Sequence, residues 1–268
     1  LVRHGSKPSR EIEKDPALLD SITAHLRSYP EAASYPPNRA FLGGLYPDQL
    51  LEMERPWFHG NGESRRWLPH GEIMPEEELI GLLKIADAFD LVWLEEGFTS
   101  LVRSALADHP LITPDDLDAL DAAKSQSDIE AEVANGAGTL PLHLRDGSLV
   151  GCISRAHDED ATLTADVILE NLACKVTAAM ALRTLLRDQG LDGSGIDYVL
   201  NTGEEAVGER YQRGGGNLAK AIAEMCGLEN ATGCDVKAFC CGPVHALVMA
   251  GALVSSGLYR QVAVVGGC

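Results

Sequence analysis

The sequence predicts an α/β fold, and two features of its second half carry that prediction. From about residue 140 onward, apolar segments of strand length alternate with amphipathic helical segments. This alternation is typical of a parallel sheet covered by helices. Before residue 140 strand signals are sparse, and Gly- and Pro-rich stretches separate the helical segments. We therefore expect two parts, an α+β elaboration over residues 1–140 and the helix-covered sheet over residues 141–268.

The first 72 residues contain one clear helical pattern. Apolar residues recur at helical spacing over residues 16–27. The sequence Tyr35-Pro-Pro-Asn predicts a chain break followed by a loop, and residues 41–72 are expected to be irregular. His59 and His70 lie in that region, but no Cys or carboxylate stands beside them at a fixed ligand spacing. The sequence therefore predicts no metal site.

The middle of the chain is predicted to form short elements. Pro75-Glu-Glu-Glu begins a helix whose first turn is acidic, where the helix dipole favours negative charge. A strand is expected at residues 90–95 and a further helix at 99–107. Thr113-Pro-Asp-Asp is an N-cap signal, and we expect exposed acidic helix and loop over residues 113–138.

The second half supplies the strands and helices of the predicted sheet. Strands are expected at residues 149–154, 196–201, 235–239 and 261–266, and helices at 164–189, 218–226 and 243–256. Gly190 is the expected end of the long helix, because glycine readily adopts the left-handed conformation that closes many helices. Gly214-Gly-Gly-Asn precedes a helix but lacks the Lys and Ser or Thr of a P-loop, so it is a weak anion-binding signal.

Composition excludes several classes of function. The 268 residues carry a formal net charge of −18 and a sequence pI near 4.7, which disfavours nucleic acid as a partner. No apolar run is long enough to span a membrane, and no signal peptide opens the chain. Seven cysteines at irregular spacing favour reduced thiols in the cytoplasm. Leu1 is not an initiator methionine and Cys268 follows an apolar strand directly, so we expect a fragment of a longer protein.

Two adjacent cysteines mark the candidate site. The predicted strand at residues 235–239 leads into Cys240 and Cys241, and Gly242 and Pro243 open the helix that follows. Unpaired N–H groups and the helix dipole at a helix N-terminus stabilise a thiolate, which is the nucleophilic form of cysteine. Glycine allows close approach of the backbone, and proline suits the first helical turn. This order of elements predicts a cysteine nucleophile on a sharp turn.

The same segment resembles a known family. Asp235-Val-Lys-Ala-Phe-Cys-Cys-Gly is similar to the nucleophile segment of thiolase-fold ketoacyl synthases, where the pattern is close to Asp-x-x-Ala-x-Cys-x-Gly. The resemblance implies the N-terminal half of a thiolase-like fold over about residues 160–268, with Cys240 as the acyl-accepting thiol. Cys241 departs from the small residue usual there, and Pro243 from a frequent aromatic. The family takes its His and Asn from the C-terminal half, so His245 is expected to be a helix-surface or core-edge residue.

A second resemblance extends over nearly the whole chain. It rests on Gly5-Ser-Lys-Pro-Ser-Arg-Glu-Ile, Tyr35-Pro-Pro-Asn, Gly71-Glu-Ile-Met-Pro-Glu-Glu-Glu and the segment from Asn201-Thr-Gly-Glu-Glu to Arg213-Gly-Gly-Gly-Asn. These segments resemble the protein C beta subunits of glycine, sarcosine and betaine reductase complexes. The resemblance implies that a carboxymethyl group carried on selenoprotein A becomes an acetyl thioester, which phosphate releases as acetyl phosphate. It implies as partners the protein C alpha subunit, selenoprotein A and phosphate, and it implies no cofactor. The resemblance to ketoacyl synthases implies a homodimer that pairs through the strand leading to Cys240.

Four residues are candidates for supporting Cys240. Gly242 would allow close backbone approach, and Cys241 could act as a second redox group, although adjacent cysteines rarely bridge each other. Asn201 and Glu204 lie where a parallel strand ends, the edge at which open sheets place ligands. Glu204, together with Glu205 and Arg210, contacts a small acid or a partner protein, or the three residues form an ordinary polar loop.

The remaining cysteines and one alternative function complete the expectations. Cys152, Cys174 and Cys226 fall on apolar faces or helix ends and are expected in the core, whereas Cys234 is placed in a turn before the Cys240 strand. If Cys240 is inert and buried, the alternative to catalysis is a scaffold function. The chain would then be a thiolase-like subunit that docks selenoprotein A and the alpha subunit.

Overall fold

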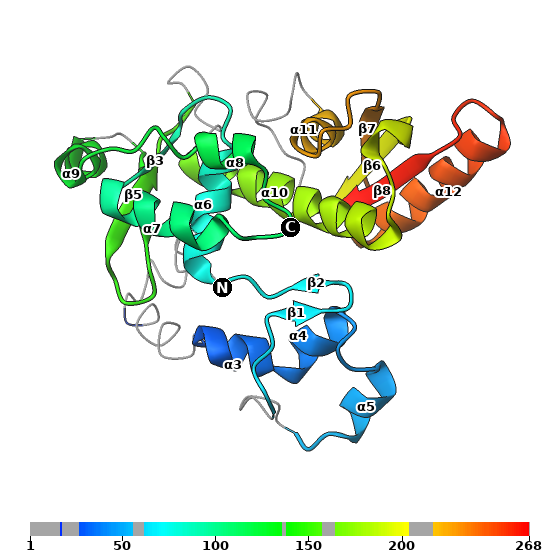
Figure 1. The fold of residues 1–268 in the computed structure, drawn as a ribbon, viewed down its shortest axis with the longest axis horizontal. Coiled ribbons are helices and arrows are strands. Elements are labelled where there is room, and N and C mark those ends of the chain that lie inside the picture. The colour runs from blue at the N-terminus through cyan, green and yellow to red at the C-terminus, as the bar shows by residue number, and fades with distance from the viewer. Residues whose placement is uncertain are drawn as a thin grey trace. The chain divides into compact units, whose positions relative to one another are not determined.

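The computed structural model describes residue 17 and residues 27–55, 62–135, 138–156, 164–203 and 217–267. Its contacts divide the chain into two compact units, Leu1–Leu79 and Ile80–Cys268 (Figure 1). Helix α6, Glu76–Ala86, begins in the first unit and continues into the second. The helix predicted over residues 16–27 falls almost wholly outside the described residues.

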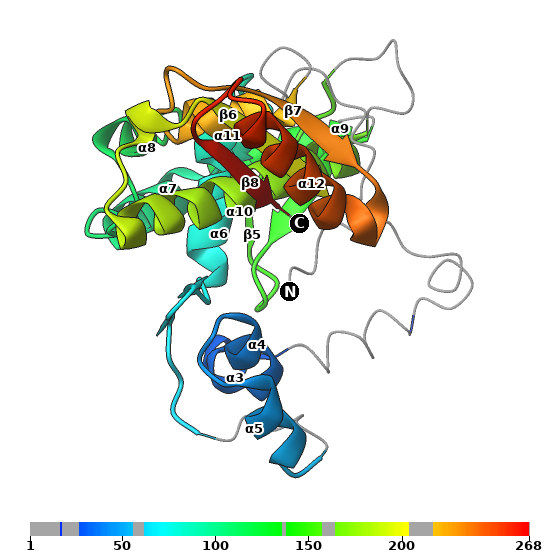
Figure 2. The same ribbon diagram turned by 90° about the vertical axis from the view of Figure 1, so that its right-hand side faces the viewer.

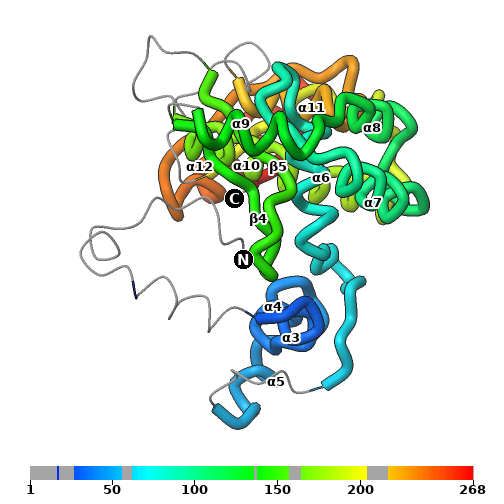
Figure 3. The backbone as a smooth tube through the Cα atoms, turned by 90° about the vertical axis from the view of Figure 1, so that its left-hand side faces the viewer, coloured from blue at the N-terminus to red at the C-terminus, as the bar shows by residue number. Residues whose placement is uncertain are grey.

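The first unit is built from short helices and one hairpin (Figures 1 and 3). Its elements are α3 (Tyr29–Ser34), α4 (Pro36–Phe41), α5 (Pro47–Glu52), β1 (Trp67–Leu68) and β2 (Gly71–Glu72). Arg66 donates to both Glu72 and Glu78 at 2.8 Å, which ties the hairpin to the start of α6. The predicted loop at Tyr35-Pro-Pro-Asn is wrong, because proline also suits the first position of a helix and α4 begins there. The irregular prediction for residues 41–72 likewise missed α5.

The second unit contains a three-stranded antiparallel sheet. Strand β5 (Leu149–Ile153) lies between β3 (Val92–Leu94) and β4 (Leu140–His143). The helices of this part are α7 (Glu96–Leu106), α8 (Pro114–Asp118) and α9 (Gln126–Asn135). The expected boundary after residue 140 falls within β4, and the paired strands β3 and β5 lie on either side of it. Strand β5 was expected in the parallel sheet, and its antiparallel pairing corrects that placement.

The parallel sheet of the second unit confirms the α/β prediction. Its strands lie in the order β7-β6-β8, and both pairs are parallel. Their bounds are Tyr198–Gly203 for β6, Thr232–Lys237 for β7 and Val262–Gly266 for β8. The accompanying helices are α10 (Ala165–Gln189), η1 (Gly193–Gly195), α11 (Leu218–Met225), η2 (Phe239–Cys241) and α12 (Gly242–Ser255). Gly190 closes α10 at φ 58°, as predicted.

Helices cover both faces of the parallel sheet. Figures 1 and 2 show α12 and α11 on opposite sides of the strands. On the α11 side, α10 and α11 pack with the sheet into a core that includes Leu182, Val199, Ile222 and Val265. On the other side α12 buries little of its length, since only Gly242 and Ala246 are buried. Its apolar residues Val244, Leu247 and Val248 are 62–67% exposed.

Candidate active site

The turn between β7 and α12 presents Cys240 at the surface. Strand β7 ends at Lys237, two residues earlier than the sequence predicted, and Phe239 has a left-handed φ of 49°. This conformation is rare for a bulky residue, and such outliers cluster at functional sites. The Cys241 N–H donates to the Ala238 carbonyl at 3.1 Å, which closes a tight turn with Cys240 exposed.

Gly242 is required by close packing beneath this turn. A Cβ atom on Gly242 would stand 2.2 Å from the Thr202 hydroxyl oxygen, at the end of the neighbouring strand β6. That separation is far inside van der Waals contact, so only glycine fits at the first residue of α12. The Thr202 side chain is buried, and its hydroxyl has no hydrogen-bond partner among the described residues. No sequence signal singled out Thr202, because a single threonine within a strand has no distinctive pattern.

Asn201 and Asp235 form a buried polar pair under the site. They lie opposite each other on β6 and β7, and the Asn201 amide donates to an Asp235 carboxylate oxygen at 3.0 Å. The same carboxylate accepts from the backbone N–H groups of Leu218 at 2.9 Å and Ala219 at 3.0 Å. Asp235 therefore caps the first turn of α11, whose orphan N–H groups need acceptors. Asn201 is 1% exposed, and its amide nitrogen faces this carboxylate.

The described cysteines fall into three groups by exposure. Cys240 and Cys241 are exposed, Cys226 and Cys234 are partly buried, and Cys152 and Cys174 are buried; none of the six forms a disulfide. Burial raises the pKa of the Cys152 thiol to about 12, with the Glu132 charge acting in the same direction. Burial likewise raises the pKa of Cys226 to about 11. Such thiols stay protonated and unreactive at neutral pH, which agrees with their expected core role.

Three further predictions can be compared with the structure. Cys234 lies within β7, opposite Leu200, and its predicted turn location is wrong because β7 begins at Thr232. His245 is exposed on α12, as expected for a helix-surface histidine. Glu204 lies outside the described residues. Cys240, Cys241 and Gly242 therefore share the turn, while the neighbouring strand brings Thr202 against Gly242 and holds Asn201 against Asp235.

The described residues contain no group of three or more His, Cys, Asp or Glu side chains that could hold a metal ion. Within the same part of the chain, every helix is too short or too polar to cross a membrane.

Comparison with known proteins identifies relatives of the chain. No family model matches the sequence. A crystal structure of the priming β-ketosynthase from the R1128 polyketide pathway aligns over 34% of this chain and 25% of its own, with 36% sequence identity and a TM-score of 0.29. The glycine/sarcosine/betaine reductase complex component C subunit beta of Peptoclostridium acidaminophilum is 36% identical over 274 residues. That match covers 100% of this chain and 52% of the relative. The chain is therefore a homologue of the beta subunit of component C, and it spans about half the length of that relative.

Proposed function

We propose that the chain is the thiol-bearing part of a glycine reductase-type complex, in which Cys240 accepts an acetyl group. The observation that carries the proposal is the exposed Cys240 on a tight turn directly before α12. A nucleophile at a helix N-terminus is favoured as thiolate. The component C homologue supports the type of complex.

The proposed chemistry has two balanced steps. In the first, the carbon–selenium bond of a carboxymethyl group on selenoprotein A breaks, and the methylene carbon gains a proton. The Cys240 sulfur bonds to the carboxyl carbon, and one carboxyl oxygen is released as a water molecule. The methylene carbon gains two electrons in this step. They come from the selenium and a thiol of selenoprotein A, which become joined by a selenium–sulfur bond. In the second step, phosphate attacks the thioester carbonyl and the Cys240 thiolate leaves. This gives acetyl phosphate with no change of oxidation state.

We propose a distinct role for each residue that supports Cys240. Gly242 lets β6 approach the start of α12, and the N–H groups of this first helical turn are candidates to stabilise an oxyanion. We assign Asn201 a positioning role, since its amide supports the Asp235 cap of α11. Cys241, exposed beside Cys240, remains a proposed second thiol of the site, and Glu204 a proposed substrate contact.

Each proposed partner has its own part in this chemistry. Selenoprotein A supplies the carboxymethyl group, the component C alpha subunit completes the component, and phosphate accepts the acetyl group. Among the described strands β7 pairs only with β6, so its second edge is available. We propose that two copies of the chain pair through this edge, because an unpaired strand edge favours association.

The test of function replaces each exposed thiol in turn within the assembled complex. Cys240→Ser removes the proposed acyl acceptor with a minimal change of shape, and acetyl phosphate formation from glycine is expected to fall by at least about a thousandfold. Cys241→Ser is the matched control, because it changes the neighbouring exposed thiol by the same atom. It is expected to keep most of the activity.

A scaffold function predicts the opposite result. If Cys240→Ser complexes assemble normally and keep full turnover, the chain acts by docking its partners and the cysteine mechanism is wrong. If Cys241→Ser alone abolishes turnover, the acyl acceptor has been assigned to the wrong thiol.

A further inference from the structure

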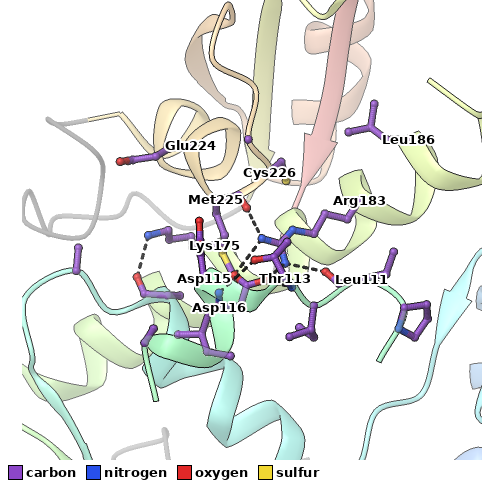
Figure 4. Close-up of a pocket in the computed structure, with 17 residues that line it drawn as sticks. Leu111, Thr113, Asp115, Asp116, Lys175, Arg183, Leu186, Glu224, Met225 and Cys226 are labelled. Atoms are coloured by element: carbon purple, nitrogen blue, oxygen red, sulfur yellow. Dashed lines mark hydrogen bonds and ion pairs between the residues drawn. The ribbon is translucent and has the colours of Figure 1, made fainter. Parts of the chain in front are cut away.

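A pocket in the second unit lies away from the Cys240 turn. It has a volume of about 570 Å³ and is bounded by the end of α6, residues 110–119, α10 and the end of α11 (Figure 4). Met225 and Cys226 line it where the chain leaves α11 and turns toward the start of β7. Cys240 follows the opposite end of β7. The pocket and the thiol site therefore lie toward opposite ends of strand β7.

Arg183 forms a rigid wall of this pocket. Its guanidinium donates to both Asp116 oxygens, at 2.6 and 3.1 Å, and to the Leu111 carbonyl at 2.9 Å. A further bond joins it to the Met225 carbonyl. These contacts, drawn in Figure 4, occupy most of its donors and neutralise its charge. Arg183 thus shapes the pocket and has little capacity left for a ligand.

Lys175 presents a different situation on the same helix. Its side chain is buried, with 8% of the residue exposed. Among the described residues its only hydrogen bond runs from Nζ to the Ala86 carbonyl, at 2.8 Å. An ammonium group has three donors, so two remain unused at the pocket wall. No carboxylate in the described part of the chain forms an ion pair with Lys175, and the more distant charges of Glu224 and Asp87 oppose the effect of burial without cancelling it. Burying such a charge is costly, and an acceptor oxygen of negative charge in contact with it would offset that cost.

The outer part of the pocket carries the opposite charge. Asp115 and Glu224 line it and are both exposed. The field of Glu224 reaches Lys175, where it opposes the lowering of the lysine pKa by burial. A simple anion would meet these carboxylates before reaching Lys175, and a simple cation would be repelled by Lys175. A molecule with a carboxylate and an ammonium group satisfies both.

The walls indicate what else the molecule carries. Apolar residues also line the pocket: Ile85, Pro110, Leu111, Ile112 and Leu186. Burying an apolar group against them is favourable. We propose that this pocket binds a zwitterionic amino acid with an apolar side chain, its carboxylate on Lys175 and its ammonium toward Glu224. This site is independent of the thiol chemistry proposed above.

Matched probes separate the two charges of the ligand. L-leucine carries both, isocaproate keeps the carboxylate and isoamylamine keeps the ammonium, on nearly the same carbon skeleton. Titration calorimetry with the full chain is expected to show saturable leucine binding, with both single-charge probes at least about tenfold weaker. Failure of leucine to bind, or equal affinity for isocaproate, overturns the proposal.

Two variants and one control place the ligand. Lys175→Met removes the ammonium and keeps the apolar stem, so leucine and isocaproate should both lose at least about tenfold in affinity. Glu224→Gln changes an exposed residue, so the variant is expected to fold normally. It should abolish the higher affinity for leucine than for isocaproate. Lys220→Met is the control, since Lys220 is exposed on α11 and does not line this pocket. Unchanged leucine affinity in folded Lys175→Met, or an unchanged preference in Glu224→Gln, contradicts the assignment.

Discussion

Asn201 and Asp235 are register partners on adjacent parallel strands, and the amide of the first donates to the carboxylate of the second at 3.0 Å. Through Asp235 this pair reaches the first turn of α11, because the carboxylate also accepts from Leu218 and Ala219. Three residues after Lys237, at the end of the same strand β7, comes Cys240. The pair therefore fixes the strand that presents the thiol.

Replacing Asp235 by Ala tests this support. The change leaves the N–H groups of Leu218 and Ala219 and the buried Asn201 amide without their acceptor, while the N-cap Asn217 remains, so the free energy of unfolding should fall by about 2–3 kcal/mol. Chemical denaturation measures the loss. Asp118→Ala is the control, since its ion pair with Arg103 spans 3.6 Å at an exposed site and should contribute less than about 1 kcal/mol. Equal losses in the two variants would show that Asp235 does not support the strand.

The close packing of Gly242 against Thr202 predicts that a destabilising substitution at Gly242 is rescued by a second substitution at Thr202. A Cβ at Gly242 would meet the Thr202 hydroxyl at 2.2 Å, so Gly242→Ala should destabilise the fold by about 1–3 kcal/mol. Thr202→Ala removes the clashing atom, and in that background the same substitution should cost little.

Gly251 provides the control on the same helix. A Cβ there meets nothing within 4 Å, so Gly251→Ala should stabilise the protein by about 0.5–1 kcal/mol. Thermal and denaturant unfolding of the four variants measures these differences. A Gly242→Ala protein as stable as Gly251→Ala would show that the helix start does not pack against β6 as described.

The buried ion pair in Figure 4 makes the third prediction. Side chains of Arg183 and Asp116 are 10% and 8% exposed and approach to 2.6 Å. Arg183→Met would leave Asp116 charged, buried and unpaired, which is expected to cost about 3–5 kcal/mol. Arg187→Met, on the same helix, breaks only an exposed pair with Asp188 and should change stability by less than about 1 kcal/mol. A similar small effect for both arginines contradicts the structural role of Arg183.

Lys175 predicts a pH dependence of stability. Burial lowers its pKa below the ordinary 10.5, while Glu224 and Asp87 act in the opposite direction. Between the folded and unfolded pKa values the unfolded chain binds more protons, so stability rises with pH in that window. When the pH is below the pKa of Lys175 in the folded chain, the full free-energy cost of burying its ammonium group is present. When the pH is above 10.5, that cost is absent.

A comparison of variants isolates this effect. The free energy of unfolding of the wild-type chain, relative to Lys175→Met, is expected to increase as the pH is raised toward 10.5. Relative to Lys220→Met, an exposed lysine, it should show no such trend. Unfolding is measured in urea without added amino acid. A difference from Lys175→Met that stays constant with pH contradicts the buried ammonium.

Much of the fold follows from local sequence patterns. The long helix α10 was predictable from its apolar periodicity and from Gly190 at its end, and α12 from its continuous apolar run. The strand β7 was placed too late, because Thr232 and Gly233 do not alternate in hydrophobicity and the strand begins there through pairing with β6. Likewise, β5 pairs antiparallel with β3, whose paired residues lie 57 to 61 positions earlier in the chain, and no local pattern specifies such a pairing.

The candidate site divides in the same way. Cys240 and Gly242 were found because the strand–cysteine–helix order has a chemical reason in the sequence itself. The left-handed Phe239 and the contact of Thr202 with Gly242 depend on how two strands and a helix meet. Asn201 was predicted to end its strand, but β6 continues to Gly203, and only the register reveals Asp235 as its partner.

The central claim is that Cys240 carries the acetyl group. The most direct measurement is peptide mapping by mass spectrometry of the complex quenched during turnover of glycine with phosphate withheld, so that the thioester has no acceptor. The account predicts an acetyl group on Cys240 that disappears when phosphate is added, with release of an equal amount of acetyl phosphate. An unmodified Cys240 in a complex that is competent for turnover would contradict it.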